Sequence, residues 1–312
     1  MSRKLISLSA AAILMSSTAM ADVPSVAVDI APVHSLVARV MRSVGEPNLI
    51  IPTNASPHRY NLRPSEAKAL QDANLVFWMG EGLAPWMENA LDSLASNAKI
   101  IALLDQKETE LMEFREGALF EEHDHDDHAD HDDHDDHDEH AHGKYDPHAW
   151  LSLENARTWL NLIAAQLSAT DPENAGVYFS NAAEARAELA TLISEVNKML
   201  KPVRGMKFVV FHDAYQYFEK SFDFPASGAI SLSDASDPSP ARIAQIHGRI
   251  KEQGIDCVLA EPQYKPGLVA TVLDGSSAKA SVIDPLGYGL EVGEELYPQL
   301  IRQMAKTLIN CL

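Results

Sequence analysis

Eight histidines lie within one acidic stretch, residues 123–142, which reads HDHDDHADHDDHDDHDEHAH. Within it, histidine recurs at every third residue from His125 to His140, and aspartate fills most of the positions between. Neutral imidazole is a good ligand for zinc, copper and nickel, and neighbouring carboxylates add attraction and further ligands. The stretch therefore indicates metal binding without selecting one transition metal. Its histidines are His123, His125, His128, His131, His134, His137, His140 and His142.

This His/Asp tract is expected to lie in a disordered loop, residues 115–144. Aspartate is a poor helix former, and like charges on one helix face repel each other. A solvated loop is the default for such a composition. Because nothing in it preorganises ligands, the loop should bind several zinc ions weakly. A loop that only solvates the chain is the alternative, although aspartate alone would be enough for that.

Three other histidines and one aspartate lie at the ends of expected strands or in short loops. His58 lies in NASPHRY, His148 in DPHAW, His212 in VFHDAY and Asp284 in VIDPLG. In open α/β sheets, ligands bind beyond the carboxyl ends of the strands, so these residues should face one cleft. Three imidazoles and one carboxylate form a four-coordinate set that suits Zn²⁺. A single histidine at a strand end is more often structural, so the prediction depends on the combination.

The elements that would position these residues form two series of alternating strands and helices. This rhythm predicts an α/β protein with two lobes, each a mostly parallel sheet flanked by helices. In the first series, the expected strands are 26–30, 48–51, 75–79 and 100–104, and the expected helices are 35–44, 64–73 and 84–94. In the second series, the expected strands are 208–211, 257–260 and 280–283, and the expected helices are 214–221, 240–253, 266–273 and 294–311.

Between the two series, residues 171–201 predict one long helix. Asp171 suits its cap and Pro172 its first position, and a pattern rich in Ala, Glu and Leu follows. Such a helix is a stiff connector, which predicts a small relative motion of the lobes. We therefore expect an N-terminal lobe over 22–168 and a C-terminal lobe over 205–312, with the metal between them.

The first 21 residues have the pattern of a cleavable signal peptide. Arg3 and Lys4 precede an apolar run, Leu5–Met15, and Ala19–Ala21 fits the cleavage pattern. The run is too short to span a bilayer, and no cysteine at the cleavage site offers a lipid anchor. We expect export to the periplasm, with a buried first helix as the alternative.

Charge and cysteine content add two constraints. The net charge of −20 argues against a nucleic acid partner, and twelve acidic residues within 121–142 supply more than half of it. Cys257 and Cys311 are the two cysteines of the chain. In an oxidising compartment such a pair favours a disulfide, and two buried thiols are the alternative.

Taken together, these motifs resemble those of the metal-binding receptors of ABC transporters (cluster A-I), and within them the periplasmic zinc-binding receptors. The motifs are PVHSLV, ASPHRYNLRPSEAKALQDANLVFW, DPHAWLSLENA, FHDAYQYFEKSF, LAEPQY and DPLG, in this order. The resemblance covers essentially the whole mature chain, including the acidic loop and the paired cysteines. It implies metal ligands at His58, His148 and His212 and a cleft carboxylate at Asp284. Related manganese receptors have a carboxylate at the third position, so His212 favours zinc.

One position departs from some zinc receptors, which have a glutamate immediately before the first histidine. This chain has Pro57 there, so the fourth ligand is either Asp284 or a water molecule. The second ring nitrogen of a ligating imidazole usually needs an acceptor. Three carboxylates are candidates for that role, with capping or surface solvation as the alternative for each: Asp146, Asp213 and Glu261.

The predicted function is high-affinity capture of Zn²⁺ in the periplasm and its delivery to the permease of a zinc-uptake ABC transporter. We expect a monomer without enzyme activity, with a periplasmic zinc chaperone as a candidate second partner. The tract would raise the local zinc concentration, and the cleft would hold one ion tightly. Because imidazole ligands must be deprotonated, zinc affinity should fall as the pH drops.

Three alternatives stay open at this point. A catalytic zinc site also has three protein ligands and an open position, although no HExxH motif supplies a base here. A metal buffer or chaperone without a transporter is the second alternative, and its loss should cause zinc sensitivity instead of zinc starvation. A manganese or iron receptor is the third, and competition binding would separate it from a zinc receptor.

Overall fold

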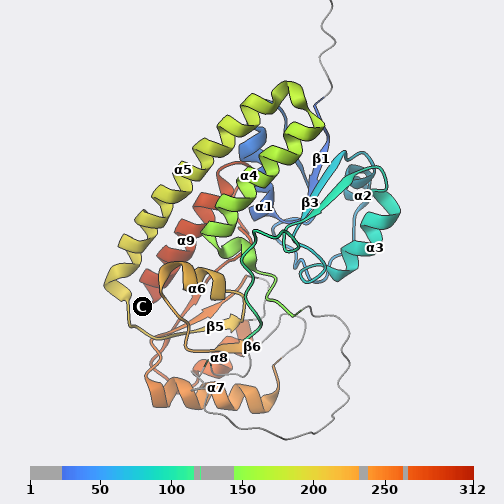
Figure 1. Ribbon diagram of the computed structural model, residues 1–312. Coiled ribbons are helices and arrows are strands. Elements are labelled where there is room, and N and C mark those ends of the chain that lie inside the picture. Colours follow the sequence, from blue (N-terminus) through green and yellow to red (C-terminus); the bar gives the residue numbers. More distant parts are fainter. Residues whose placement is uncertain (1–22, 116–119, 121–143, 232–237, 263–265) are drawn as a thin grey trace, which may run out of the picture.

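Two parallel sheets, one in each half of the chain, form the framework of the molecule (Figure 1). Within the described residues, no helix combines the length and the apolar character needed to cross a membrane. The computed structural model describes residues 23–115, 120, 144–231, 238–262 and 266–312. The expected signal peptide, residues 1–21, and the His/Asp tract therefore lie outside the described residues.

The N-terminal sheet has four parallel strands in the order β2-β1-β3-β4. Its central strands are apolar and fully buried, as expected where helices cover both faces of a parallel sheet, and the edge strand begins with the exposed Lys99. The strands are β1 (Val26–Val28), β2 (Asn48–Leu49), β3 (Leu75–Trp78) and β4 (Lys99–Ala102). The connecting helices, each with proline in its first turn, are α1 (Ala31–Met41), α2 (Pro64–Gln71) and α3 (Pro85–Leu94).

The C-terminal sheet repeats this plan with the order β6-β5-β7-β8, again with all strands parallel. Its edge strand also begins with an exposed lysine, Lys279. The strands are β5 (Phe208–His212), β6 (Ala229–Ser231), β7 (Cys257–Ala260) and β8 (Lys279–Val282). The helices are α6 (Gln216–Phe222), α7 (Pro240–Gln253), α8 (Pro266–Leu273) and α9 (Leu296–Cys311).

The predicted two-lobe α/β architecture is confirmed, and two elements add to it. Helix α4 (Leu153–Thr170) begins at Ser152, whose hydroxyl accepts a hydrogen bond from the backbone N–H of Asn155. Its buried residues recur at helical spacing, so the signal is present in the sequence. Strand β6 has only three residues, which is too short to show a period.

The predicted connecting helix is also present, as α5 (Ala175–Leu200) after a single 3₁₀ turn at Pro172–Asn174. Its 26 residues extend about 39 Å at the usual rise per residue. Figure 1 shows α5 running along one side of the molecule from the first lobe to the second. Along its length it packs against α1, α4 and α9, so it is a helix fixed by tertiary contacts and not a free linker.

Helix α9 ties the two lobes together a second time. It packs against α1 and α5, and the backbone N–H of Tyr297 donates to the Ser35 hydroxyl at 2.9 Å. At its far end, the structure contains the predicted disulfide between Cys257 and Cys311, whose Cα atoms are 5.7 Å apart. The bridge fixes the last turn of α9 to the start of β7, at the opposite end of that strand from residue 261.

Replacing both cysteines by alanine should destabilise the fold but leave metal binding intact. The bridge closes a loop with a sequence separation of 54, so its loss should lower the free energy of unfolding by about 2–4 kcal/mol. Urea denaturation of the double variant against the parent protein measures this difference. A variant of unchanged stability, or one with weakened zinc binding at full folding, would contradict the account.

Candidate metal centre

His212 is the last residue of β5 and lies at the carboxyl edge of the C-terminal sheet. The neighbouring strand β7 runs parallel to it, with Val210 opposite Leu259, so Glu261 follows at the same edge. The Glu261 carboxylate accepts a hydrogen bond from His212 Nδ1 at 2.5 Å, and the two residues are 2% and 3% exposed. A buried carboxylate at Nδ1 fixes the ring orientation and leaves Nε2 as the nitrogen that presents a lone pair.

His148 is held in the same way by a carboxylate from its own loop. Asp146 Oδ1 accepts from both His148 Nδ1, at 2.6 Å, and the His148 backbone N–H, at 2.9 Å. Burial alone would raise the pKa of Asp146, but the charge and hydrogen bonds of His148, with a hydrogen bond from Gln216, hold it below its usual range. Asp146 is therefore ionised at neutral pH, and the proton of His148 belongs on Nδ1.

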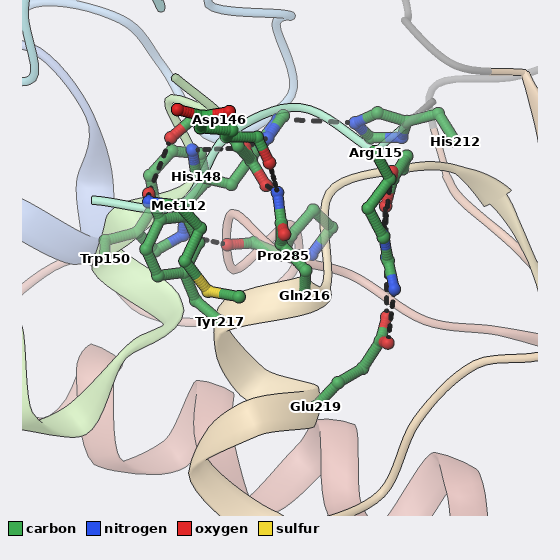
Figure 2. Close-up of polar contacts among 12 residues, drawn as sticks. Met112, Arg115, Asp146, His148, Trp150, His212, Gln216, Tyr217, Glu219 and Pro285 are labelled. Atoms are coloured by element: carbon green, nitrogen blue, oxygen red, sulfur yellow. Dashed lines mark hydrogen bonds and ion pairs between the residues drawn. The ribbon is translucent and has the colours of Figure 1, made fainter. Parts of the chain in front are cut away.

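The two imidazoles meet across the lobes through their Nε2 atoms. His148 Nε2 and His212 Nε2 are 3.4 Å apart, within hydrogen-bond distance if one of them carries a proton (Figure 2). On a tetrahedral zinc ion with Zn–N bonds of about 2.0–2.1 Å, two ligand nitrogens lie about 3.3–3.4 Å apart. A cation shared by the two nitrogens would therefore fit the same spacing. The pair has the spacing of two zinc ligands, with a carboxylate at each Nδ1.

His58 approaches this pair from the N-terminal lobe. Its ring centroid is 5.6 Å from that of His148, and the preceding carbonyl, Pro57 O, accepts a hydrogen bond from Trp86 Nε1 at 2.8 Å. The loop after β2 is thus held against α3. Among the residues that the structure describes, no three His, Cys, Asp or Glu side chains already enclose an ion position. The three rings are adjacent, but His58 would have to close on the other two to complete a site.

Asp284 follows β8 at the same edge of the C-terminal sheet as His212 and Glu261. Its Oδ1 accepts from the backbone N–H groups of Leu286 and Gly287, at 2.9 and 3.1 Å, whereas its buried Oδ2 has no hydrogen-bond partner among the residues that the structure describes. Burial, aided by repulsion from Glu261, raises the pKa of Asp284 to about 6. An unsatisfied buried carboxylate oxygen is costly, and a nearby cation would offset that cost.

Helix α6 supports Asp146 from the opposite lobe, a role that the sequence analysis misses. Gln216 Nε2 donates to Asp146 Oδ2 at 2.5 Å, and Tyr217 Oη donates to the Asp146 backbone carbonyl at 2.9 Å. A sequence signal exists, because both residues lie in the motif that also contains His212 and in the first turn of the following helix. The same short segment thus supplies one imidazole and orients the other.

Asp213, expected beside a ligating histidine, has a different partner. Glu261 accepts from His212 Nδ1, whereas the Asp213 carboxylate accepts from Arg115 Nε, at 3.0 Å for each oxygen. Successive residues at a strand end point to opposite sides, which separates the side chains of residues 212 and 213. Burial raises the pKa of Asp213 despite the attraction of Arg115.

Two further histidines contact backbone carbonyls. His34 Nε2 lies 2.9 Å from Pro47 O, and His247 Nε2 lies 2.7 Å from Asp274 O. In addition, Trp150 is buried and donates from Nε1 to Pro285 O at 2.8 Å. This bond joins the loop of His148 to the loop of Asp284.

Both ends of the expected acidic loop, residues 115–144, have defined contacts. Arg115 is held by carboxylates, Glu113 and Tyr145 form an antiparallel bridge, and Lys144 Nζ pairs with Glu113 Oε1 at 2.6 Å. Strand pairing and ion pairs therefore order these ends. These described ends lie beside the segment that carries Asp146 and His148.

Comparison with known proteins relates the chain to a family of zinc-uptake components. Residues 26–311 match the family described as "ZnuA: Zinc-uptake complex component A periplasmic". The chain is 46% identical to a "High-affinity zinc uptake system protein ZnuA" of Brucella abortus (strain 2308), covering 92% of this chain and 91% of that protein. A protein of the same name from Paracoccus denitrificans (strain Pd 1222) is 43% identical, over 94% and 93% of the two chains.

The fold is also found in a solved structure. A crystal structure of ZnuA superposes with a TM-score of 0.74 at 22% sequence identity, covering 93% of this chain and 99% of that chain. At this identity the likeness establishes the fold alone.

Replacing Asp146 by asparagine should weaken metal binding about 10–100-fold, because an amide fixes the His148 tautomer less firmly than a carboxylate. The measurement is zinc competition against a chelator of known affinity. Asp171→Asn is the matched control, since Asp171 is also buried but accepts from Asn174 and Tyr178 at the junction of α4 and α5. Equal zinc affinities in the parent and Asp146→Asn would refute the role of Asp146.

Proposed function

We infer the function from one premise: this chain belongs to the ZnuA family of periplasmic zinc-uptake components. It captures Zn²⁺ with high affinity in the periplasm and is the binding component of an ABC-type zinc-uptake system, with a membrane permease as its partner. As a transporter component it is not an enzyme. Zinc is its cargo, so the site must bind the ion tightly and still release it.

We propose that His58, His148 and His212 are the protein ligands of this zinc ion. The observation that carries the proposal is the 3.4 Å separation of His148 Nε2 and His212 Nε2, with a carboxylate at each Nδ1. Two histidines with a structural role alone would not need a carboxylate at each Nδ1 and Nε2 atoms that meet at this spacing. His58 is the third ligand because its ring lies against His148 and its loop belongs to the other lobe from His212.

Asp284 is the fourth ligand in this proposal. Its Oδ2 is the buried oxygen without a hydrogen-bond partner, while Oδ1 is held by two backbone N–H groups. The carboxylate is thus fixed at one oxygen and available at the other. A water molecule in the fourth position is the alternative, and it would leave Asp284 as a nearby charge that is not bound to the metal.

Substituting any one of the three histidines by alanine should abolish tight zinc binding. We expect at least a ~100-fold weaker affinity from each, since one of four ligands is lost from the ion. His247→Ala is the control, because that imidazole contacts the backbone carbonyl of Asp274 and lies on α7. Asp284→Asn separates the two candidates for the fourth ligand, since weakened binding supports Asp284 and an unchanged affinity supports water.

The His/Asp tract is proposed as an auxiliary site that gathers several zinc ions weakly. Support comes from the described residues on either side of the tract, because Glu113 and Tyr145 pair as an antiparallel bridge next to the segment of Asp146 and His148. Ions held there have a high effective concentration at the cleft. Tight binding is assigned to the cleft because its ligands are fixed by buried carboxylates, whereas the composition of the tract fixes none.

A variant lacking residues 121–142 should keep one tight zinc site and lose only weak ones. Titration calorimetry of this variant beside the full protein measures both classes in one experiment. If tight binding disappears with the tract, the three-histidine site is wrong and the protein is better described as a metal buffer. If the weak class is unchanged, the auxiliary role of the tract is wrong.

Three further points belong to this proposal. Residues 1–21 act as a signal peptide that is cleaved on export, in agreement with the periplasmic family. The mature protein works as a monomer, because a permease must reach the cleft between the lobes. A periplasmic zinc chaperone is a second partner that would load the same cleft.

A further inference from the structure

Arg115 is an isolated cation at the start of the acidic loop. It is the only lysine or arginine between Lys107 and Lys144, a span that includes the whole His/Asp tract. A cation in such surroundings could simply lie in solvent among the acidic side chains. Instead, its side chain is 21% exposed, and its guanidinium group points toward Glu219 (Figure 2).

Its partners are two buried carboxylates of the opposite lobe. Arg115 Nη1 donates to Glu219 Oε2 at 2.7 Å and Nη2 donates to Glu219 Oε1 at 3.0 Å, while Nε and Nη2 donate to Asp213. The side chains of Asp213 and Glu219 are 2% and 6% exposed. On its outer face, the guanidinium carbon lies 3.5 Å from the centroid of the Phe120 ring. Every donor of the fork is thus directed at a carboxylate, and an aromatic ring limits access of water.

Arg115 connects the two segments that carry the inner pair of histidines. On one side, the backbone around Arg115 pairs with the segment before His148: Asp146 N donates to Met112 O at 2.8 Å, and Glu113 bridges Tyr145. On the other side, Asp213 directly follows His212, and Glu219 lies on α6. The guanidinium is therefore a charged crosslink between the support of His148 and the support of His212.

We propose that Arg115 is a positioning residue for the zinc site, which sets the distance between His148 and His212 by clamping the root of the acidic loop onto Asp213 and Glu219. This inference rests on the proposed three-histidine site and assigns no metal contact to Arg115. Two carboxylates buried side by side repel each other unless a cation lies between them, so its removal should displace the turn between β5 and α6. His212 moves with that turn, and the spacing of the two Nε2 atoms changes with it.

Lysine cannot replace arginine fully in this place. The ammonium group is a point donor and cannot reach both carboxylates with the fork geometry of guanidinium. Arg115→Lys should therefore keep the charge and the fold, but the spacing between the segments that carry His148 and His212 should be less well fixed. Arg115→Met removes the charge as well, and should have the larger effect.

The test compares zinc affinity and the cobalt spectrum of Arg115→Met, Arg115→Lys and Arg302→Met. Arg302 is the matched control, since it forms a fork with Glu195 between α9 and α5, away from the histidines. Zinc affinity is measured by chelator competition well below the melting temperature of each variant. The d–d absorption of bound Co²⁺ reports the geometry of the ligands, which a loss of global stability alone would not alter.

We expect Arg115→Met to bind zinc about 10–100-fold more weakly with an altered cobalt spectrum, Arg115→Lys to lie between it and the parent, and Arg302→Met to match the parent. The proposal is overturned if Arg115→Met folds and has the zinc affinity and the cobalt spectrum of the parent protein. It is also overturned if Arg302→Met loses as much zinc affinity as Arg115→Met. If Arg115→Met does not fold, Arg115→Lys decides by the same criteria. His212→Ala in the same series tests the site itself, since tight zinc binding there would refute the three-histidine site whatever Arg115 does.

Discussion

The 3.4 Å spacing between His148 Nε2 and His212 Nε2, two imidazole nitrogens from opposite lobes, is the constraint on which the rest of the structure depends. Side-chain freedom alone would not maintain this spacing. It is maintained because Nδ1 of each ring is bonded to a buried carboxylate, Asp146 for His148 and Glu261 for His212. The same spacing suits two nitrogens on one tetrahedral zinc ion, so the fold keeps the pair prepared for a cation.

The two histidines are supported first by neighbouring side chains and then by whole helices. Gln216 and Tyr217 on α6 hold Asp146, Trp150 links the loop of His148 to Pro285, and the Tyr297 hydroxyl donates to Trp150 O at 2.7 Å. Beyond them, α5 and α9 lie across both lobes and restrict their relative motion. His58 lies on the loop after β2, which α3 holds through the hydrogen bond from Trp86 Nε1 to Pro57 O. His148 is therefore supported by both lobes, and the third proposed ligand is positioned by the N-terminal lobe.

Sequence patterns predict the parts of this arrangement that each segment determines by itself. The buried strands are apolar runs, and His212 marks the end of one of them, so both the sheets and the edge that carries the site follow from local signals. Gln216 and Arg115 are different, since their roles depend on which side chains of the other lobe face them. Asp213 shows the same limit: its place beside His212 in the sequence favours a role at the imidazole, but the alternation of side chains directs it to Arg115 instead. Local sequence patterns therefore do not predict which side chains contact each other across the two lobes.

The chemistry of the ligands explains how such a site can favour zinc and still release it. Imidazole nitrogens suit zinc, whereas oxygen ligands suit calcium, magnesium and manganese, so a set with three imidazoles disfavours the hard cations. In the proposed site, the charge of the ion would be balanced by Asp284 directly and by Asp146 and Glu261 through the Nδ1 protons of the imidazoles, so those two carboxylates stay off the metal. Because the proposed ligands are divided between two lobes, a small separation of the lobes would remove some of them and leave the others in place. In this proposal, tight binding and release depend on the same distance between the ligands of the two lobes, and a permease would need to change only that distance.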